Sequence, residues 1–328
     1  MEGPGQMKIL ITEPLDFSNE NLKLLKEVAE VKIGPFTRME LIKEIEDMEV
    51  LILRLNHFID REVFLKADNL QYILTPTTGL NHIDLEEAAA RNIEIISLIG
   101  ETEFLATIPS TGEHTWALLL SLLRKIPQGF DHVKKGGWER DQFKAHNLCH
   151  YTLGLLGFGR VGKQIAEYAK VFKMPFVFYD INPELRDHPN ACNSLEELLK
   201  KIDILSIHIP LNDQNSQFLN GSNLTHLKRG TYIVNTSRGE LIDEDYIAEA
   251  LKAKELGGYA TDVLANEIIR EKRKENPLMK IAATVDNLII TPHIAGATYE
   301  SMWKTEEFVI RKWLKNLDTS NNTWPKMR

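Results

Sequence analysis

The sequence is poor in cysteine and has no surplus of basic residues. It contains 2 cysteines in 328 residues, Cys149 and Cys192, too few for a disulfide framework and not at metal-ligand spacing. Their scarcity indicates a reducing, cytoplasmic setting. With 39 Lys and Arg against 47 Asp and Glu, the net charge of −8 argues against general nucleic-acid binding, because no excess of cations can meet phosphates. We therefore expect neither a metal site nor a nucleic-acid partner.

Long apolar runs are also missing. The longest, around Trp116–Leu120, is far shorter than a membrane span. The N-terminus lacks the charged segment and apolar stretch of a secretory signal, and residues 1–6 are expected to be a loose leader. The densest charged run, Arg270–Glu275, is mixed in sign, which is typical of a solvated surface segment. We expect no membrane partner.

What the sequence does contain is an alternation of short apolar runs with amphipathic stretches, over a length that suits two domains. Strands are expected at 8–11, 50–53, 72–74, 93–96, 152–156, 176–179, 202–207, 232–235, 258–261 and 288–291. Helices are expected at 18–29, 61–66, 85–91, 109–125, 161–172, 194–200, 243–254 and 297–314. Such alternation predicts parallel strands joined by crossover helices. Because the pattern restarts after 109–125, it predicts two α/β units, the second a doubly wound sheet.

The sharpest local motif is Gly157-Phe158-Gly159-Arg160-Val161-Gly162, between an expected strand and an expected helix. A loop of this kind brings backbone N–H groups and the positive end of a helix against a pyrophosphate. Asp180 ends the next expected strand, where its carboxylate can accept hydrogen bonds from both ribose hydroxyls. The same carboxylate would repel a 2′-phosphate, so the motif favours NAD over NADP.

Three further clusters each follow an expected strand. They contain Arg238, the pair Asp262 and Glu267, and His293 within "TPHIAG". In an open parallel sheet the carboxyl ends of the strands meet at one edge, where ligands bind. An arginine, a carboxylate and a histidine at that edge, beside a dinucleotide motif, indicate a catalytic site.

With these motifs in place, the chain resembles the D-isomer-specific 2-hydroxyacid dehydrogenase family, which includes phosphoglycerate, glycerate, lactate and formate dehydrogenases. The resemblance is carried by "TTGLNHIDL" (77–85), "GEHTWALLLSLLR" (112–124), "LGLLGFGRVG" (153–162), "IHIPL" (207–211), "IVNTSRGELIDE" (233–244), "DVLANE" (262–267) and "TPHIAGAT" (291–298). It implies two doubly wound parallel-sheet α/β domains. A Rossmann NAD-binding domain, 104–295, would be inserted into a flavodoxin-like substrate-binding domain, 1–103 and 296–328, with closure on ligand expected.

The resemblance also implies residue roles. Arg238 would grip the substrate carboxylate and carbonyl oxygen, because a planar fork suits two oxygens. His293 would be the general acid/base for the 2-keto oxygen, and Glu267 would orient its ring. The implied cofactor contacts are Gly157, Gly159, Arg160, Val161, Gly162, Asp180, Pro210, Thr236, Asp262, His293 and Gly296. The implied substrate contacts are Arg54, Gly79, Leu80 and Arg238.

Three departures and two alternatives accompany the resemblance. Ile268 stands where the family often has proline, Leu264 and Ala265 alter a usual polar-aromatic pattern, and 268–287 carries a charged extension bordering the site. No regulatory domain is expected after the last helix. A homodimer is implied, joined through the nucleotide domain near the 109–125 helix. One alternative is a NAD-sensing, corepressor-like interaction protein; the other is a formate or phosphite dehydrogenase on the same scaffold.

Overall fold

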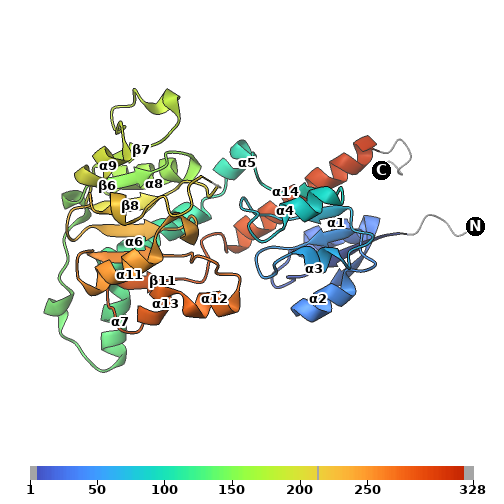
Figure 1. The fold of residues 1–328 in the computed structure, drawn as a ribbon, viewed down its shortest axis with the longest axis horizontal. Helices are drawn as coiled ribbons and strands as arrows, with labels where there is room; N and C mark the ends of the chain where they lie inside the picture. Colours follow the sequence, from blue (N-terminus) through green and yellow to red (C-terminus); the bar gives the residue numbers. More distant parts are fainter. Residues whose placement is uncertain (1–5, 213, 321–328) are drawn as a thin grey trace, which may run out of the picture. The chain divides into compact units, whose positions relative to one another are not determined.

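The computed structural model describes residues 6–212 and 214–320, so most of the expected leader lies outside the described residues. The chain divides into two compact units, residues 1–107 with 297–328 and residues 108–296 (Figure 1). The first boundary therefore lies four residues beyond the predicted position, 103/104. Helix α5 (Thr102–Ala106) accounts for the difference, because Phe104 stacks on Phe308 of the first unit with ring centroids 4.1 Å apart.

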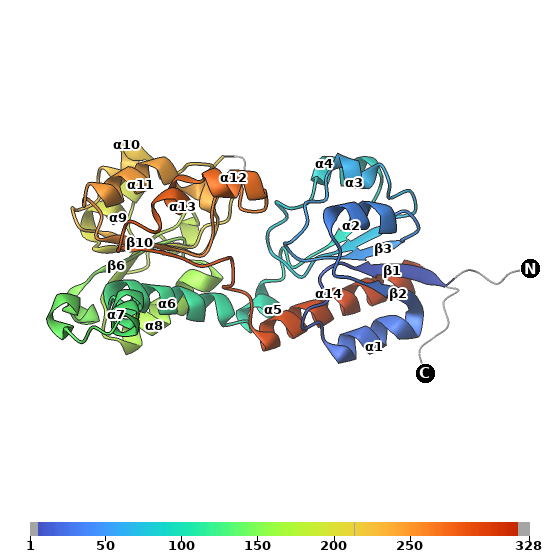
Figure 2. The ribbon, with the colours of Figure 1, turned by 90° about the horizontal axis from the view of Figure 1, so that it is seen from below.

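The first unit contains a five-stranded sheet of order β2-β1-β3-β4-β5, parallel throughout. Its strands are β1 (Met7–Ile11), β2 (Ala29–Ile33), β3 (Val50–Ile52), β4 (Tyr72–Leu74) and β5 (Glu94–Ile96). One face is covered by α1 (Asn19–Val28) and α14 (Tyr299–Ser320), the other by α2 (Arg38–Glu44), α3 (Arg61–Phe64) and α4 (Leu85–Ala90) (Figure 2). This strand order is the flavodoxin-like doubly wound order that was predicted.

One element of this sheet was predicted wrongly. The expected helix 18–29 ends at Val28, and β2 begins at the next residue. β2 lies at the sheet edge and pairs only with β1, so it buries little and carries charged residues such as Glu30 and Lys32. An edge strand that follows a helix without a loop has neither the long apolar run nor the turn residues by which strands are found.

The second unit contains a six-stranded parallel sheet of order β11-β10-β9-β8-β6-β7. Its strands are β6 (Leu153–Leu156), β7 (Phe176–Tyr179), β8 (Ile204–Ile207), β9 (Tyr232–Asn235), β10 (Gly258–Thr261) and β11 (Leu288–Ile290). Beyond β7, Ala191 pairs with Phe178 as an isolated parallel bridge. Ala191 thus stands where the Rossmann order 3-2-1-4-5-6 has its third strand, and the predicted Rossmann arrangement is confirmed with that strand reduced to a bridge.

Helices cover both faces of this sheet (Figure 2). One face carries α6 (Ser110–Leu123) and α8 (Arg160–Val171), the other α9 (Leu195–Lys201), α10 (Gly221–Leu224), α11 (Glu244–Lys252) and α13 (Pro277–Ile281). The unit also has α7 (Ile126–Lys134), α12 (Arg270–Glu275) and the 3-10 turns Arg140–Phe143, Leu148–His150, Pro183–Leu185 and Gly239–Leu241. Within the described residues, no helix combines the length and apolarity that crossing a membrane requires. The chain reverses its direction of strand addition between β6 and β8, the point at which doubly wound sheets bind ligands.

Candidate active site

The glycine loop follows β6 and begins α8. Gly157 has φ +93°, and a Cβ there would lie 2.7 Å from His208 O. A Cβ on Gly162 would lie 2.3 Å from Gly157 O, so the packing of loop and helix requires both glycines. Gly159 differs, because a Cβ there would meet no atom of the described residues within 4 Å. The space in front of Gly159, the residue that precedes α8, is therefore open for an anionic ligand such as a pyrophosphate.

Asp180 lies beside this loop at the end of β7. Its Oδ2 accepts a hydrogen bond from Phe158 N at 2.7 Å, and its Oδ1 accepts one from Asn182 N at 2.8 Å. The carboxylate is thereby fixed against the glycine loop. Each carboxylate oxygen can accept more than one hydrogen bond, so Asp180 retains acceptor capacity for the hydroxyls of a ribose.

The remaining predicted cofactor contacts lie around the same sheet edge or at the start of α8. The Arg160 Nη1 donates to Ile108 O at 3.1 Å, and Val161 packs partly against the core under α8. The Thr236 hydroxyl is 2.7 Å from the hydroxyl of Thr115 on α6 and is buried. Two other predicted contacts are exposed, Pro210 after β8 and Gly296 after β11.

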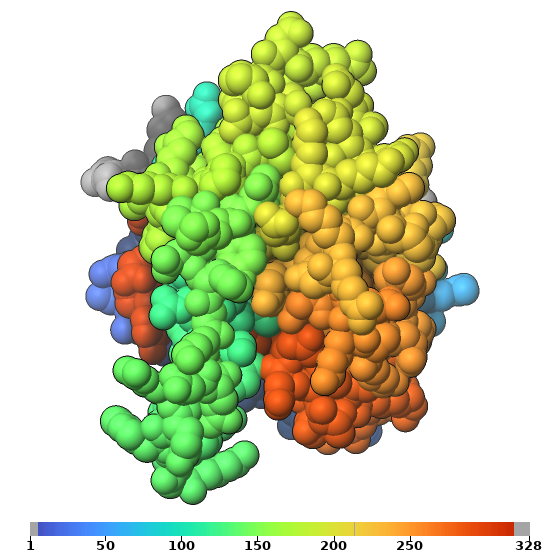
Figure 3. Space-filling model, turned by 90° about the vertical axis from the view of Figure 1, so that its left-hand side faces the viewer, coloured from blue at the N-terminus to red at the C-terminus, as the bar shows by residue number. Residues whose placement is uncertain are grey.

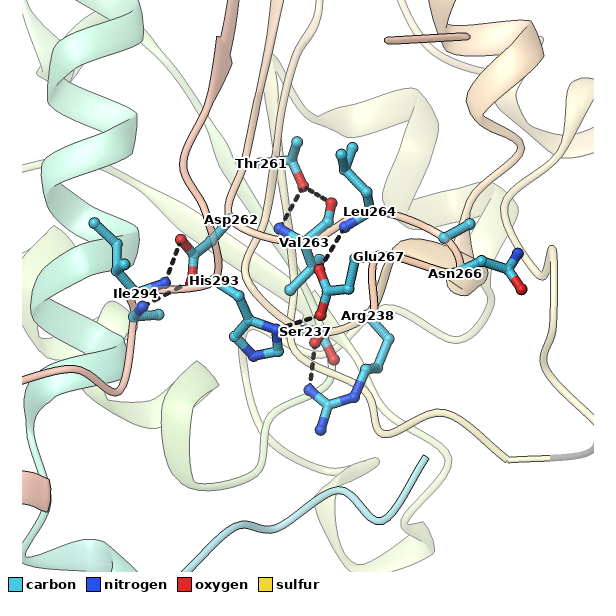
Figure 4. A network of polar contacts seen from close by, with 12 residues as sticks. Ser237, Arg238, Thr261, Asp262, Val263, Leu264, Asn266, Glu267, His293 and Ile294 are labelled. Carbon is cyan, nitrogen blue, oxygen red and sulfur yellow. Dashed lines mark hydrogen bonds and ion pairs between the residues drawn. The ribbon is translucent and has the colours of Figure 1, made fainter. Parts of the chain in front are cut away.

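Arg238, Glu267 and His293 follow the adjacent strands β9, β10 and β11. Nδ1 of His293 is hydrogen-bonded to Oε1 of Glu267, whose Oε2 accepts Leu264 N at 3.0 Å. Nη1 of Arg238 donates to Ser237 O at 2.7 Å. Figure 4 shows the Arg238 and His293 side chains extending in the same direction from the strand ends. The three predicted catalytic residues therefore form one cluster with a histidine–carboxylate pair at its centre.

The backbone of His293 is held in an unusual conformation by Asp262. His293 has φ +54°, and its N–H donates to Asp262 O at 2.9 Å. The fully buried Asp262 carboxylate accepts Ile294 N at 2.9 Å through Oδ1 and Ala295 N at 2.7 Å through Oδ2 (Figure 4). A left-handed backbone is unfavourable for histidine, so these bonds from Asp262 stabilise the turn that presents the ring.

The Asp262 carboxylate also contacts His114, a residue to which the sequence analysis gave no role. Nε2 of His114 on α6 lies 3.3 Å from Asp262 Oδ1 and 3.0 Å from the Thr291 hydroxyl. Burial by itself would raise the pKa of Asp262, but the hydrogen bonds from His114, Thr291 and the two backbone amides outweigh it, and the pKa is lowered. Asp262 is therefore an ionised anchor beneath the His293 turn.

His208, within the "IHIPL" stretch, is a second residue without a predicted role. Its Nε2 is 2.8 Å from the Ser206 hydroxyl, and its carbonyl lies against Gly157. Burial lowers the pKa of His208 to about 3, and the charge of Arg160 adds to this effect. The ring is therefore neutral at ordinary pH and adds no positive charge to the glycine loop.

The other predicted substrate residues belong to the first unit. Arg54 lies two residues beyond β3, and its guanidinium forms an ion pair with the buried Glu306 of α14. The backbone N–H of Arg54 donates to Glu13 Oε1 at 3.0 Å. Gly79 and Leu80 lie in the loop after the neighbouring β4, where Gly79 O accepts a hydrogen bond from the Thr77 hydroxyl at 2.8 Å. Within that unit, all three lie beyond the carboxyl ends of adjacent strands.

The chain is similar in sequence and in structure to known dehydrogenases and reductases. Residues 116–295 match the family described as D-isomer specific 2-hydroxyacid dehydrogenase, NAD binding domain. The chain is 33% identical over 316 residues to D-3-phosphoglycerate dehydrogenase of Methanocaldococcus jannaschii, covering 95% of this chain but 57% of that relative's length. It is 32% identical to glyoxylate reductase of Thermofilum pendens, covering 88% and 86%. The solved structure of NAD-dependent formate dehydrogenase from Staphylococcus aureus in complex with NAD is 27% identical with a TM-score of 0.81, covering 98% of each chain.

The family match spans more than half of the chain and includes the glycine loop, Arg238, Glu267 and His293. The glyoxylate reductase is similar over nearly its whole length, so the likeness extends beyond the nucleotide-binding unit. The open cradle at Gly159 and the carboxylate of Asp180 fit the cofactor named in the family's description. The chain therefore belongs to the family of D-isomer specific 2-hydroxyacid dehydrogenases, and residues 116–295 belong to its NAD-binding domain.

Proposed function

We propose that the chain catalyses the NAD-dependent interconversion of a small 2-keto acid and the corresponding D-2-hydroxy acid. The observation that carries this proposal is the Glu267–His293 pair beside Arg238, in the same sheet as the glycine loop. When bound, the nicotinamide supplies or accepts the hydride. Because Nδ1 of His293 pairs with Glu267, Nε2 is the nitrogen that gives a proton to the keto oxygen in reduction and takes it back in oxidation. The Arg238 guanidinium binds the substrate's carboxylate and carbonyl oxygens.

We also propose that each unit binds a different ligand. Residues 108–296 would hold NAD, with Asp180 disfavouring a 2′-phosphate through charge repulsion. The first unit would bind the substrate carboxylate through the backbone N–H groups of Gly79 and Leu80. The guanidinium of Arg54 is paired with Glu306. Arg54 would therefore contribute to substrate binding by orienting the polar groups at the end of β3.

A substrate screen tests the proposal directly. Purified protein with NADH is mixed with a panel of 2-keto acids that includes phosphorylated members, and NADH absorbance is followed. We expect saturable oxidation of NADH with at least one of these acids. A protein that binds NADH but reduces none of the panel would contradict the proposal.

A formate-type dehydrogenase is the second candidate, supported by the likeness to the Staphylococcus aureus enzyme. Such an enzyme also fits an arginine and a histidine beside the nicotinamide, so Arg238 and His293 suit both activities. Formate and phosphite with NAD therefore form the reverse arm of the same screen. NADH formation from either of them, without reduction of any 2-keto acid, would establish the second candidate in place of the first.

Two glycine substitutions test the cofactor site. Gly159→Ala places its Cβ in open space, so it is expected to fold normally and to weaken NADH binding by about tenfold or more through a clash with the pyrophosphate. Gly162→Ala drives its Cβ into Gly157 O and is expected to destabilise the fold by about 1–3 kcal/mol. NADH fluorescence titration and thermal unfolding separate the two effects. Wild-type NADH affinity in Gly159→Ala would exclude this loop as the pyrophosphate site.

We also propose that a second copy of the chain packs on α7. Ile126, Phe130 and Val133 lie on one side of this helix and are exposed, and Trp138 beyond it is 83% exposed. Figure 3 shows the green segment that contains α7 at the surface of the second unit. The three exposed apolar side chains on one side of α7 form a patch of a kind typical of a protein–protein interface.

The oligomeric state is tested with matched substitutions. Phe130→Asp places a charge at the centre of this patch and is expected to convert a dimer to a monomer, as measured by light scattering during size-exclusion chromatography. Val171→Asp is the control, because Val171 is 78% exposed on α8 and lies outside the patch. A monomeric wild type, or dissociation by both variants, would contradict the proposed interface.

A further inference from the structure

The loop that carries Glu267 is held by side chains at four consecutive amides. Val263 N donates to the Thr261 hydroxyl at 3.2 Å, and Leu264 N donates to Glu267 itself at 3.0 Å. The next two amides donate to carboxylates from outside the loop: Ala265 N to Glu244 at 3.1 Å and Asn266 N to Glu240 at 2.9 Å. The position of Glu267 therefore depends on carboxylates contributed by the segment after Arg238.

Glu244 is the buried member of this set. It is 5% exposed at the start of α11, and its Oε1 accepts the hydrogen bond from Ala265 N. Its Oε2 accepts one from Asn276 Nδ2 at 2.6 Å, and Asn276 is itself 4% exposed. Asn276 Oδ1 accepts Leu278 N at 2.9 Å, which fixes the amide so that its NH₂ group faces Glu244. Glu244 thus meets a donor at each oxygen, and only a carboxylate provides two acceptors there.

The electrostatic setting of Glu244 is unfavourable for stability. Burial raises its pKa to about 7; the hydrogen bonds from Ala265 and Asn276 oppose this rise, and the charges of Glu240 and Glu267 add to it. A buried carboxyl near two other carboxyls costs free energy that an apolar residue would avoid. Its hydrogen bonds to Ala265 N and Asn276 Nδ2 offset part of this cost and fix the geometry of the loop.

Two neighbouring contacts tie the same loop to the surrounding chain. A Cβ on Gly239 would lie 2.1 Å from Ala265 N, so the segment that follows Arg238 packs directly on the loop. On α12, Arg273 Nη1 donates to Glu267 O at 2.7 Å. The charged run that was predicted to be a solvated segment is indeed exposed, but through Arg273 it also contacts the backbone of Glu267.

We propose that Glu244 is a positioning residue for the Glu267–His293 pair, joining the 262–267 loop to Asn276 at the start of α13. The inference rests on the proposed function, because it assigns Glu244 to the same site. Glu244 touches neither substrate nor cofactor in this role. It acts through Ala265 N–H, which sets where Glu267 stands and therefore how His293 is oriented.

The test exploits the two donors that face Glu244. Glu244→Gln keeps the shape but replaces one acceptor by an NH₂ group, which opposes a donor at either site. Measured at pH ~8.5, above the pKa of about 7, kcat is expected to fall by about 10- to 100-fold because the loop shifts. KM and NADH affinity are expected to remain at wild-type values, since the glycine loop and Arg238 are unchanged.

A swap of the two side-chain types provides the rescue. In the double variant Glu244→Gln/Asn276→Asp, the new carboxylate at 276 accepts from the new amide at 244 and still accepts from Leu278 N. We expect kcat to recover most of its wild-type value. Glu249→Gln is the matched control, because Glu249 lies exposed on the same helix and its carboxylate pairs with Lys252 at the surface. This control is expected to match the wild type.

Any of three outcomes would overturn the role of Glu244. The first is wild-type kcat in Glu244→Gln, and the second is a double variant no more active than the single one. The third is a loss of NADH binding in parallel with kcat, because it would indicate general disruption. Wild-type turnover is established first with the substrate screen, so failure of the proposed function is seen before any variant is compared.

Discussion

Replacement of Arg238 by glutamine is expected to lower kcat/KM for 2-keto acid reduction by about 10²–10³-fold, while NADH affinity stays at the wild-type value. The guanidinium is a charged, planar fork that can donate to two oxygens at once, whereas glutamine offers one neutral amide. Arg238 follows β9 and the glycine loop follows β6, so the proposed substrate and pyrophosphate sites lie at different strand ends. Stopped-flow turnover and NADH fluorescence titration measure the two effects separately.

Two controls sharpen this result. Arg238→Lys keeps the charge without the fork, so its activity is expected to lie between those of the wild type and Arg238→Gln. Arg229→Gln makes the same chemical change at an exposed arginine in the same unit and is expected to be silent. If Arg238→Gln lost NADH binding to the same extent as turnover, Arg238 would be a structural or cofactor residue rather than the substrate's anchor.

Replacement of His293 by asparagine is expected to lower kcat by about 10²–10⁴-fold, because it removes the group that we propose exchanges a proton with the substrate oxygen. Asparagine tolerates the φ of +54° found at this position, so the turn held by Asp262 is expected to persist. The activity that remains should also lose the pH dependence that the imidazole confers on kcat/KM. A pH–rate profile of variant and wild type provides the measurement.

Comparison with a second histidine variant tests whether this effect is specific. His150→Asn removes an exposed imidazole from the same unit and is expected to leave both kcat and the pH–rate profile unchanged. Glu267→Gln is expected to lose less activity than His293→Asn, since an amide oxygen can still accept a hydrogen bond from Nδ1. An unaltered pH–rate profile in His293→Asn would remove this residue from the acid/base role.

Features that depend on residues close together in the sequence could be predicted from it. The α/β class, the parallel sheets and the family resemblance are confirmed, because apolar periodicity and short motifs carry them. The glycine loop was found because its glycines stand at fixed spacing, and they do so because Gly157 has φ +93° and a Cβ on Gly162 would meet Gly157 O. β2 was not found, because an edge strand with charged residues has no distinctive pattern.

The contacts between distant segments could not be predicted in this way. The sequence placed Asp262, Glu267 and His293 at strand ends, but the bond between His114 and Asp262 joins helix α6 to the residue after β10, about 150 positions further along the chain. The bond between Glu244 and Asn276 joins residues 32 positions apart. The local sequence around each of these residues does not indicate its partner, because each side chain taken alone is typical of an ordinary polar residue.

The sequence by itself therefore determined which groups are present: a glycine loop that suits an anion, a carboxylate that suits a ribose, and an arginine, a glutamate and a histidine at strand ends. The tertiary structure decided how those groups are held. His293 pairs with Glu267 because β10 and β11 are neighbours in the sheet. The loop of Glu267 is held by the buried carboxyl of Glu244 and by the carboxyl of Glu240, which accept hydrogen bonds from its amides. The physical reason is that hydrogen bonds form between atoms a few ångströms apart in space, and the order of strands in the sheet sets which atoms those are.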